Sequence, residues 1–326
     1  MTRKTIKYLF VILVILVVST TVGLTYFFYA NEAPITKGKI SYNVTYKNNL
    51  SLDIYHPTNI LYDKSPLVLF VHGGAWIAGR KESMNVNRVN GAINKLRDHG
   101  YTIISIEYTL ARDKKTPFPA CIVDGFDAIQ WISSHADSLN LDMDNFGIMG
   151  ESAGAHIAMM NTITNPADFG LSHPKLAMDY MIDIYGPSDL YRLYRSESLD
   201  SIMTMIKELP KPINQHLNLA HRVFGFDPEV DQEKTKSFAD QYSPVTYLND
   251  KIPPVLMIHG DADQVVPLDQ SISLKSRLDS LGIENEIHIL EGTNHAFIGA
   301  DDTQKADIQR WIFDFIESRR SAKSQD

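Results

Sequence analysis

Short runs of hydrophobic residues recur along the chain and predict the strands of a sheet. Residues 40–46 and 50–55 alternate hydrophobic and polar positions, which predicts an antiparallel hairpin that turns at 47–49. Residues 66–71 are hydrophobic throughout, as in a strand buried on both faces. Runs of similar character occupy 101–108, 146–149, 180–185, 254–258 and 286–290. Most of these strands are therefore expected to be covered on both sides.

Segments with hydrophobic residues at helical spacing lie between these runs. In residues 118–135 the hydrophobic positions include Ile122, Phe126, Ile129 and Ile132. Further helices are predicted over 153–163, 268–281 and 304–316. Strands that alternate with helices in this way predict an α/β fold, with a mostly parallel, twisted sheet and helices on both faces.

Residues 186–253 interrupt the alternation, because they contain no strong strand pattern. A loop of this length without structure is uncommon in a compact domain, so we predict a helical insertion over about residues 187–250. Hydrophobic residues such as Leu190, Leu193, Ile202 and Ile206 would form its buried side. A lid over a site is the favoured interpretation, and a purely structural excursion is the alternative.

The N-terminal segment has the pattern of a membrane anchor. Residues 8–30 carry no charge, and a helix over them would rise about 34 Å, enough to cross a hydrocarbon core. Three basic residues precede it, which places the N-terminus in the cytoplasm. We therefore predict a transmembrane signal-anchor at 1–31 and an extracytoplasmic domain at 32–326. A cleaved signal would give a secreted protein instead, but the bulky residues 26–29 do not suit a cleavage site.

Charge and cysteine content exclude several classes of protein. Residues 1–31 have a net charge of +3, and the other residues hold 28 basic and 39 acidic side chains, or −11. Such an acidic domain does not match a nucleic-acid backbone, so no nucleic-acid partner is expected. The single cysteine, Cys121, excludes an intramolecular disulfide and a multi-cysteine metal site. It lies on the hydrophobic side of the predicted helix and is expected to be buried there.

A G-x-S-x-G motif, residues 150–154, lies between a predicted strand and a predicted helix. The small residues around Ser152 suit the tight strand–turn–helix arrangement that exposes a nucleophile. Ser152 would then stand at a helix N-terminus, where free N–H groups favour developing negative charge. A structural turn that contains serine by chance is the alternative. His156, one helical turn later, is expected to be a buried helix residue.

A glycine-rich loop, His72-Gly73-Gly74-Ala75-Trp76, directly follows the buried strand 66–71. Backbone N–H groups held rigidly in such a loop can stabilise the oxyanion of acyl transfer, and glycine allows close approach. We predict the N–H groups of Gly73, Gly74 and Ala153 as the donors. His72 resembles a base or metal ligand, but it is expected to hold the loop through hydrogen bonds.

Two later loops supply a carboxylate and an imidazole at strand ends, where such sites assemble. Asp263 lies deeper than Asp261 in the loop 259–267, so Asp263 is the predicted acid and Asp261 a stabiliser of the loop. His295 lies after the last predicted strand and is the predicted base.

Four motifs together resemble the α/β-hydrolase fold, and more narrowly the carboxylesterase branch related to hormone-sensitive lipase, particularly acetyl- and feruloyl-esterase-like proteins. They are H-G-G-A-W at 72–76, G-E-S-A-G-A-H at 150–156, H-G-D-A-D-Q-V-V-P at 259–267 and G-T-N-H-A-F at 292–297. The resemblance covers about residues 40–318 and implies the triad Ser152, Asp263 and His295, which needs no metal or organic cofactor. Ala75 and Thr109 depart from the family pattern: Ala75 occurs in arylformamidases, and Thr109 replaces an arginine.

These observations predict a serine carboxylesterase that acts on a small-molecule ester through an acyl-enzyme on Ser152. An amide-cleaving hydrolase, either arylformamidase-like or an exopeptidase, is the alternative within enzymes. A non-catalytic binding module on a hydrolase scaffold is the alternative outside them. The acyl group, the alcohol and the oligomeric state do not follow from the sequence.

Overall fold

The computed structural model describes residues 35, 37–85, 89–112, 115–197 and 219–323, except for the side chains of 321–323. The predicted anchor at 1–31 lies outside this part. Among the described residues, no helix has both the length and the hydrophobicity needed to span a bilayer.

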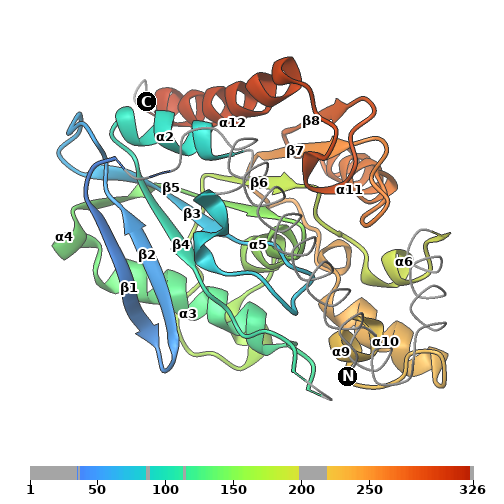
Figure 1. Cartoon of the computed structure of the whole chain (residues 1–326). Coiled ribbons are helices and arrows are strands. Elements are labelled where there is room, and N and C mark those ends of the chain that lie inside the picture. Colours follow the sequence, from blue (N-terminus) through green and yellow to red (C-terminus); the bar gives the residue numbers. More distant parts are fainter. Residues whose placement is uncertain (1–34, 36, 86–88, 113–114, 198–218, 324–326) are drawn as a thin grey trace, which may run out of the picture.

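An eight-stranded sheet forms the centre of the described fold, with the order β1-β2-β4-β3-β5-β6-β7-β8 (Figure 1). The strands β1 and β2 form the predicted antiparallel hairpin, β2 also pairs antiparallel with β4, and all other pairs are parallel. The prediction of a mostly parallel sheet is confirmed. The strands are β1 (Ile40–Lys47), β2 (Leu50–Tyr55), β3 (Ser65–Val71), β4 (Thr102–Ile106), β5 (Leu141–Glu151), β6 (Tyr180–Ile184), β7 (Val255–Gly260) and β8 (Asn285–Leu290).

Helices cover both faces of this sheet (Figure 1). On one face α2 (Asn90–Asp98) and α12 (Asp302–Lys323) pack with Val68 and Phe70 of β3. On the other face α3 (Ala120–Ser134), α5 (Ala153–Ile163) and α11 (Asp269–Ser280) pack with Leu67 and Leu69. Alternate residues of β3 thus enter opposite cores, which explains its continuous hydrophobic run. Shorter helical segments are α4 (Ala136–Leu139), η1 (Lys81–Asn85), η2 (Pro166–Phe169), η3 (Pro244–Thr246) and η4 (His295–Phe297).

Two elements differ from the sequence-based expectation. The helix α2 was not predicted, because its short pattern offers only three buried hydrophobic positions, Ala92, Ile93 and Leu96. The strand β5 begins at Leu141, five residues before the hydrophobic run at 146. Residues 142–145 include three polar residues and only one hydrophobic residue, Met143, so they carry no strand signal, although Leu141 and Asp142 pair with β3.

The predicted insertion contains α6 (Leu190–Tyr194), α9 (Leu219–Phe224) and α10 (Gln232–Tyr242), and residues 198–218 lie outside the described part. The helix α10 joins the body through aromatic contacts, since Tyr242 stacks on Phe118 with ring centroids 5.0 Å apart. His156 Nε2 also bonds the Tyr242 carbonyl oxygen at 2.6 Å. His156 is buried, as expected, and it connects the helix after Ser152 to the insertion.

Candidate active site

Ser152 lies in a tight turn between β5 and α5. Its backbone has φ +52° and ψ −121°, a strained conformation for a residue with a side chain, and its N–H donates to the Ile184 carbonyl oxygen at 2.9 Å. The turn is close to its neighbours: a Cβ placed on Gly154 would lie 2.1 Å from the Val71 carbonyl oxygen. The predicted elbow is therefore present, and it requires glycine where the sequence has it.

Ser152, His295 and Asp263 form one hydrogen-bonded line. The Ser152 Oγ lies 3.0 Å from His295 Nε2, and His295 Nδ1 lies 2.7 Å from Asp263 Oδ2. An ionised carboxylate only accepts hydrogen bonds, so Nδ1 carries the proton and Nε2 is free to accept from the serine hydroxyl. The structure thus brings together three residues that are up to 143 positions apart, in the geometry of a nucleophile, base and orienting acid.

Asp263 is held in place by both backbone and side-chain donors. Its Oδ1 accepts the N–H groups of Val265 and Val266 at 2.8 and 2.9 Å. Burial raises the pKa of this carboxyl, but hydrogen bonds from His259 and His295 outweigh burial and hold it well below its usual range. The carboxylate is therefore ionised at any pH where the protein would work.

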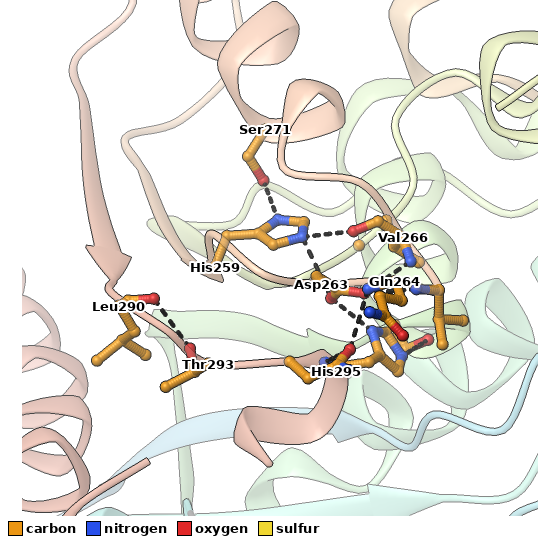
Figure 2. A network of polar contacts seen from close by, with 12 residues as sticks. His259, Asp263, Gln264, Val266, Ser271, Leu290, Thr293 and His295 are labelled. Carbon is orange, nitrogen blue, oxygen red and sulfur yellow. Dashed lines mark hydrogen bonds and ion pairs between the residues drawn. The ribbon is translucent and has the colours of Figure 1, made fainter. Parts of the chain in front are cut away.

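His259 is a supporting residue that the sequence analysis did not identify (Figure 2). Its Nε2 points toward the Val266 carbonyl oxygen, at 2.8 Å, and toward Asp263 Oδ2, at 3.4 Å. Both are acceptors, so Nε2 carries the proton and Nδ1 can accept from the Ser271 hydroxyl at 2.8 Å. His259 thereby ties the Asp263 loop to α11. Its position directly before Gly260-Asp261 was the only available signal.

The loops of Asp263 and His295 are also joined to each other. Asp261 accepts the Gly292 N–H at 2.7 Å, which confirms its expected role as a stabiliser of the loops. The Asn294 side chain accepts from the N–H groups of Gln264 and His295, at 3.0 and 2.7 Å. These bonds fix the acid and base loops relative to each other, so the triad geometry does not depend on the triad bonds alone.

The three residues predicted to donate their N–H groups to the oxyanion have different surroundings. Ala153 begins α5, where the first N–H groups of a helix have no partner within the helix. Gly74 has φ +123°, and a Cβ there would lie 2.2 Å from the Ala78 carbonyl oxygen. The Gly73 backbone lies against Glu151 and favours the ionised form of its carboxylate, which lowers the pKa of that carboxyl. The sequence could not reveal this contact of Gly73 with Glu151, and all three N–H groups stay predicted oxyanion donors.

His72 stabilises the glycine-rich loop, as expected. Its Nδ1 donates to the Gly73 carbonyl oxygen at 2.7 Å, and its ring stacks on Tyr108 with centroids 4.3 Å apart. Burial lowers the pKa of His72 to about 4, so the ring is neutral near pH 7. The described residues include no cluster of three or more histidine, cysteine or acidic side chains suited to a metal ion.

Lys47, at the end of β1, and Thr109, which stands where the resembled family has an arginine, share one buried partner. Lys47 Nζ lies 2.7 Å from Asp124 Oδ1, and the Thr109 N–H donates to Asp124 Oδ2 at 2.8 Å. Asp124 is buried on α3, so these two bonds attach both the hairpin and the loop after β4 to that helix. A cavity of about 720 Å³ lies beside them, but Ser152 is not among its lining residues.

A smaller cavity of about 90 Å³ does include Ser152. Its described wall combines the glycine-rich loop, the inserted helices α6 and α9 and the loop after Asp263, and none of the described lining residues is charged. The lining residues are Ala75, Trp76, Ser152, Pro187, Leu190, Leu193, Tyr194, Ala220, Val223, Phe224, Val265 and Val266. A group bound next to the nucleophile would therefore be uncharged and apolar.

A family model described as BD-FAE matches residues 52–278 of the chain. An arylesterase of Saccharolobus solfataricus is 34% identical over 262 residues, which cover 78% of this chain and 75% of that protein. Esterase LipC of Mycobacterium tuberculosis is 25% identical over 84% of this chain and 63% of LipC. Esterase LipQ and the probable carboxylic ester hydrolase LipM of the same organism are covered over 61% and 56% of their lengths. The chain thus spans about three fifths of these mycobacterial relatives.

Solved structures share the fold at low sequence identity. A truncated carbohydrate esterase from gut microbiota has a TM-score of 0.68 at 23% identity, over 89% of this chain and 99% of that chain. The esterase Est2 of Thermogutta terrifontis has a TM-score of 0.61 at 20% identity, over 86% and 91% of the two chains. These similarities support the architecture, and the site geometry carries the chemistry.

Proposed function

Because this chain belongs to the BD-FAE family of α/β-hydrolases, we propose that it is a serine hydrolase that cleaves carboxylic esters. The observation that carries the proposal is the hydrogen-bonded line from Ser152 through His295 to Asp263. Ser152, at one end of this line, also lines an apolar cavity. The family resemblance inferred from the four motifs is confirmed by the family model.

Ester cleavage would proceed in two steps. The Ser152 Oγ attacks the ester carbonyl carbon while His295 Nε2 removes its proton, and Asp263 stabilises the resulting imidazolium. The imidazolium then protonates the departing alcohol, which leaves an acyl group on Ser152. Water, activated by the same imidazole, releases the acid in the second step.

The oxyanion would be stabilised by backbone N–H groups of α5 and the glycine-rich loop. The predicted set is Gly73, Gly74 and Ala153, and Gly73 also lies against Glu151. The following amide, Ala75, lines the cavity beside Ser152 and is a further candidate. Loss of one such donor reduces turnover by about 10²–10³-fold.

The substrate would be a small ester with an uncharged acyl or aryl group. Its acyl side would face Leu190, Leu193 and Phe224 of the inserted helices, so we assign residues of about 187–250 the role of a lid that selects substrates. A charged terminal group of a peptide would find no charged side chain among the described lining residues of this cavity, which disfavours an exopeptidase.

The test compares p-nitrophenyl acetate, butyrate and octanoate with the purified full chain in detergent. We expect turnover that favours the shorter esters and that Ser152→Ala abolishes. Unchanged turnover in that variant would show that another group is responsible. A fluorophosphonate probe should label the wild type and not the alanine variant, and an unlabelled wild type would support the non-catalytic alternative.

Amide cleavage is separated by a second comparison on the same protein. N-formylkynurenine and an aminoacyl-naphthylamide should be turned over more slowly than the acetate ester. A higher kcat/KM for either amide would replace the esterase proposal with the corresponding amidase.

For location, we propose that residues 1–31 anchor the chain in the cell membrane, with the hydrolase domain outside the cytoplasm. The support is the uncharged stretch at 8–30, preceded by three basic residues and no acidic ones. Removal of this segment by cleavage would instead release the domain as a secreted enzyme.

A further inference from the structure

Glu151 places a buried carboxylate directly before the nucleophile, and the mechanism above gives it no role. It ends β5, and 6% of the residue is exposed. A carboxylate is costly to bury unless it is hydrogen-bonded or faces a positive charge, so its partners indicate what it does.

The first two partners come from separate elements. The Tyr185 hydroxyl, just after β6, donates to Glu151 Oε2 at 2.8 Å. The backbone of Gly73, in the glycine-rich loop, favours the ionised form of the same carboxylate. The contact with Gly73 is close, since a Cβ there would lie 3.5 Å from Glu151 Cγ and 3.4 Å from Ser152 Cβ. Glu151 thus joins the oxyanion loop to the end of β6, on either side of the nucleophile.

Tyr185 extends this connection to the base. Its ring lies against the His295 ring, with centroids 4.8 Å apart and planes at 60°, and against Phe297, also at 4.8 Å. Its backbone has φ +44° and is held by a bond from its N–H to the Ile258 carbonyl oxygen. The Glu151 carboxylate fixes the hydroxyl end of this ring, and therefore the wall on which the imidazole rests.

The charge of Glu151 also acts on His295. Burial raises the pKa of Glu151 to about 6, although the bond from Tyr185, the backbone of Gly73 and the attraction of His295 lower it. Tyr108 also lies within electrostatic reach of Glu151, but its deeply buried hydroxyl donates to the His72 carbonyl oxygen and stays protonated. His72 behind it is neutral near pH 7. Glu151 and Asp263 are thus two buried anions that interact with an imidazolium on His295.

We propose that Glu151 is a positioning residue for the ester hydrolysis assigned above: its ionised carboxylate holds the Gly73 loop and the Tyr185 ring in place, and it stabilises the imidazolium that forms on His295. The inference rests on the proposed function. It adds a second buried anion to the triad, one that is supplied by the variable position of the G-x-S-x-G motif.

Substitutions of Glu151 and of its partner Tyr185 are expected to shift the pH profile of kcat/KM in opposite directions. Glu151→Gln keeps the shape and removes the charge, so the imidazolium loses stabilisation and the apparent pKa of the base falls. The acid limb of kcat/KM should move down by about 0.5–1 pH unit, with a loss of about tenfold in kcat. Tyr185→Phe keeps the ring and removes one donor to the carboxylate, so Glu151 ionises at higher pH and the acid limb should move up.

The experiment measures kcat/KM for p-nitrophenyl acetate between about pH 5 and pH 9, and the rate of fluorophosphonate labelling of Ser152 over the same range. Full-length wild type, Glu151→Gln, Tyr185→Phe and the control Glu291→Gln are compared. Glu291 is exposed and lies four positions before His295, so removal of its screened charge should leave both profiles unchanged.

Opposite shifts of the acid limb in the first two variants would support the proposal. An acid limb that stays in place in both, whatever the loss of rate, would reduce Glu151 to a structural residue. If Glu151→Gln does not fold, the Tyr185→Phe variant alone tests the proposal: an acid limb that moves up supports it, and one that moves down or stays in place contradicts it. If esters are not hydrolysed but Ser152 is labelled, the ester proposal fails, and the labelling profiles still test Glu151. If neither occurs, the base is not active and both proposals fail.

Discussion

Asp263 and Glu151 are two buried carboxylates beside the same imidazole, and their surroundings shift their pKa values in opposite directions. Burial opposes ionisation of both, but Asp263 has two histidines and backbone N–H groups as donors, and its pKa lies well below the usual range. Glu151 has fewer donors, and its pKa is raised to about 6. Asp263 is therefore a permanent charge, whereas Glu151 changes its charge at mildly acidic pH.

Asp263→Asn tests the orienting role of the permanent charge. An asparagine can present its NH₂ group to His295, which favours the tautomer in which Nε2 carries the proton and cannot accept from Ser152. We expect kcat to fall by about 10³–10⁴-fold with little change in KM. Asp261→Asn is the matched control, because Asp261 lies in the same loop as Asp263 but accepts its hydrogen bond from the Gly292 N–H, in the loop of His295. Its loss of kcat should be far smaller. Equal losses in both variants would contradict the assignment of the acid.

Asp183 on β6 provides a pH-dependent test of stability. Burial raises the pKa of this carboxyl to about 7, against a usual value of 3.8, and its Oδ2 has no hydrogen-bond partner. The folded state therefore holds a proton that the unfolded state loses between about pH 4 and pH 7, so this group makes the fold less stable as pH rises through that window.

Asp183→Asn should therefore raise the Tm at pH 8, because the amide keeps an acceptor for the Gly186 N–H and carries no charge. The gain should shrink as the pH falls and be absent well below the usual pKa of 3.8, where the carboxyl is protonated in both states. Thermal unfolding followed by circular dichroism at several pH values checks this. A gain that is the same at every pH would show that the carboxyl is not the cause.

At the scale of elements, the site depends on the packing of the turn between β5 and α5 against the end of β3. A Cβ placed on Gly150 would lie 2.4 Å from the Gly154 carbonyl oxygen, and a Cβ placed on Gly154 would lie 2.1 Å from the Val71 carbonyl oxygen. The elbow can therefore approach β3 only without these side chains. This approach places Ser152 beside the glycine-rich loop that follows β3.

Gly154→Ala should separate α5 from β3. A methyl group 2.1 Å from the Val71 carbonyl oxygen requires a backbone shift, with an expected loss of about 1–3 kcal/mol in the free energy of unfolding and a larger proportional loss of activity. Gly282→Ala is the control: no atom lies within 4 Å of its Cβ, so only its positive φ is strained. Urea unfolding and ester turnover measure the two effects. Wild-type activity in Gly154→Ala would mean that the elbow tolerates the shift.

At the scale of the molecule, the site residues lie together at one edge of the sheet, at the carboxyl ends of the parallel strands. The loops after β3, β5, β7 and β8 supply the oxyanion loop, nucleophile, acid and base in that order. Residues of the helices α6 and α9 of the insertion line the cavity beside Ser152. If they select the acyl group, as proposed above, specificity and chemistry come from different parts of the chain.

Deletion of residues 1–31 tests how the whole molecule is located. The full chain should sediment with membranes and resist extraction by high salt, and the truncated chain should be soluble with a similar kcat/KM. A full chain that is soluble with its N-terminus intact would contradict the anchor. A mature protein that begins near residue 31 would instead establish the cleaved-signal alternative.

Much of the fold and the three triad residues could be predicted from the sequence, because their signals are local. Hydrophobic periodicity follows from which side chains face the core, and the small residues of the elbow follow from the tight turn they must form. The failures are also local in origin: α2 is too short to show a clear period, and polar residues interrupt the hydrophobic pattern at the start of β5. Whether residues 1–31 span a membrane stays a prediction.

The tertiary structure alone decided the partners of the buried polar groups. Gly73 and Tyr185 meet at Glu151 from positions far apart in the chain, and His259 reaches Asp263 only because the loop after β7 folds back over it. Whether a hydrogen bond forms depends on differences of a few tenths of an ångström in the donor–acceptor distance. The packing of the entire sheet and its helices determines these distances. The sequence therefore identifies the reacting groups, while the structure shows which neighbours set their charge and orientation.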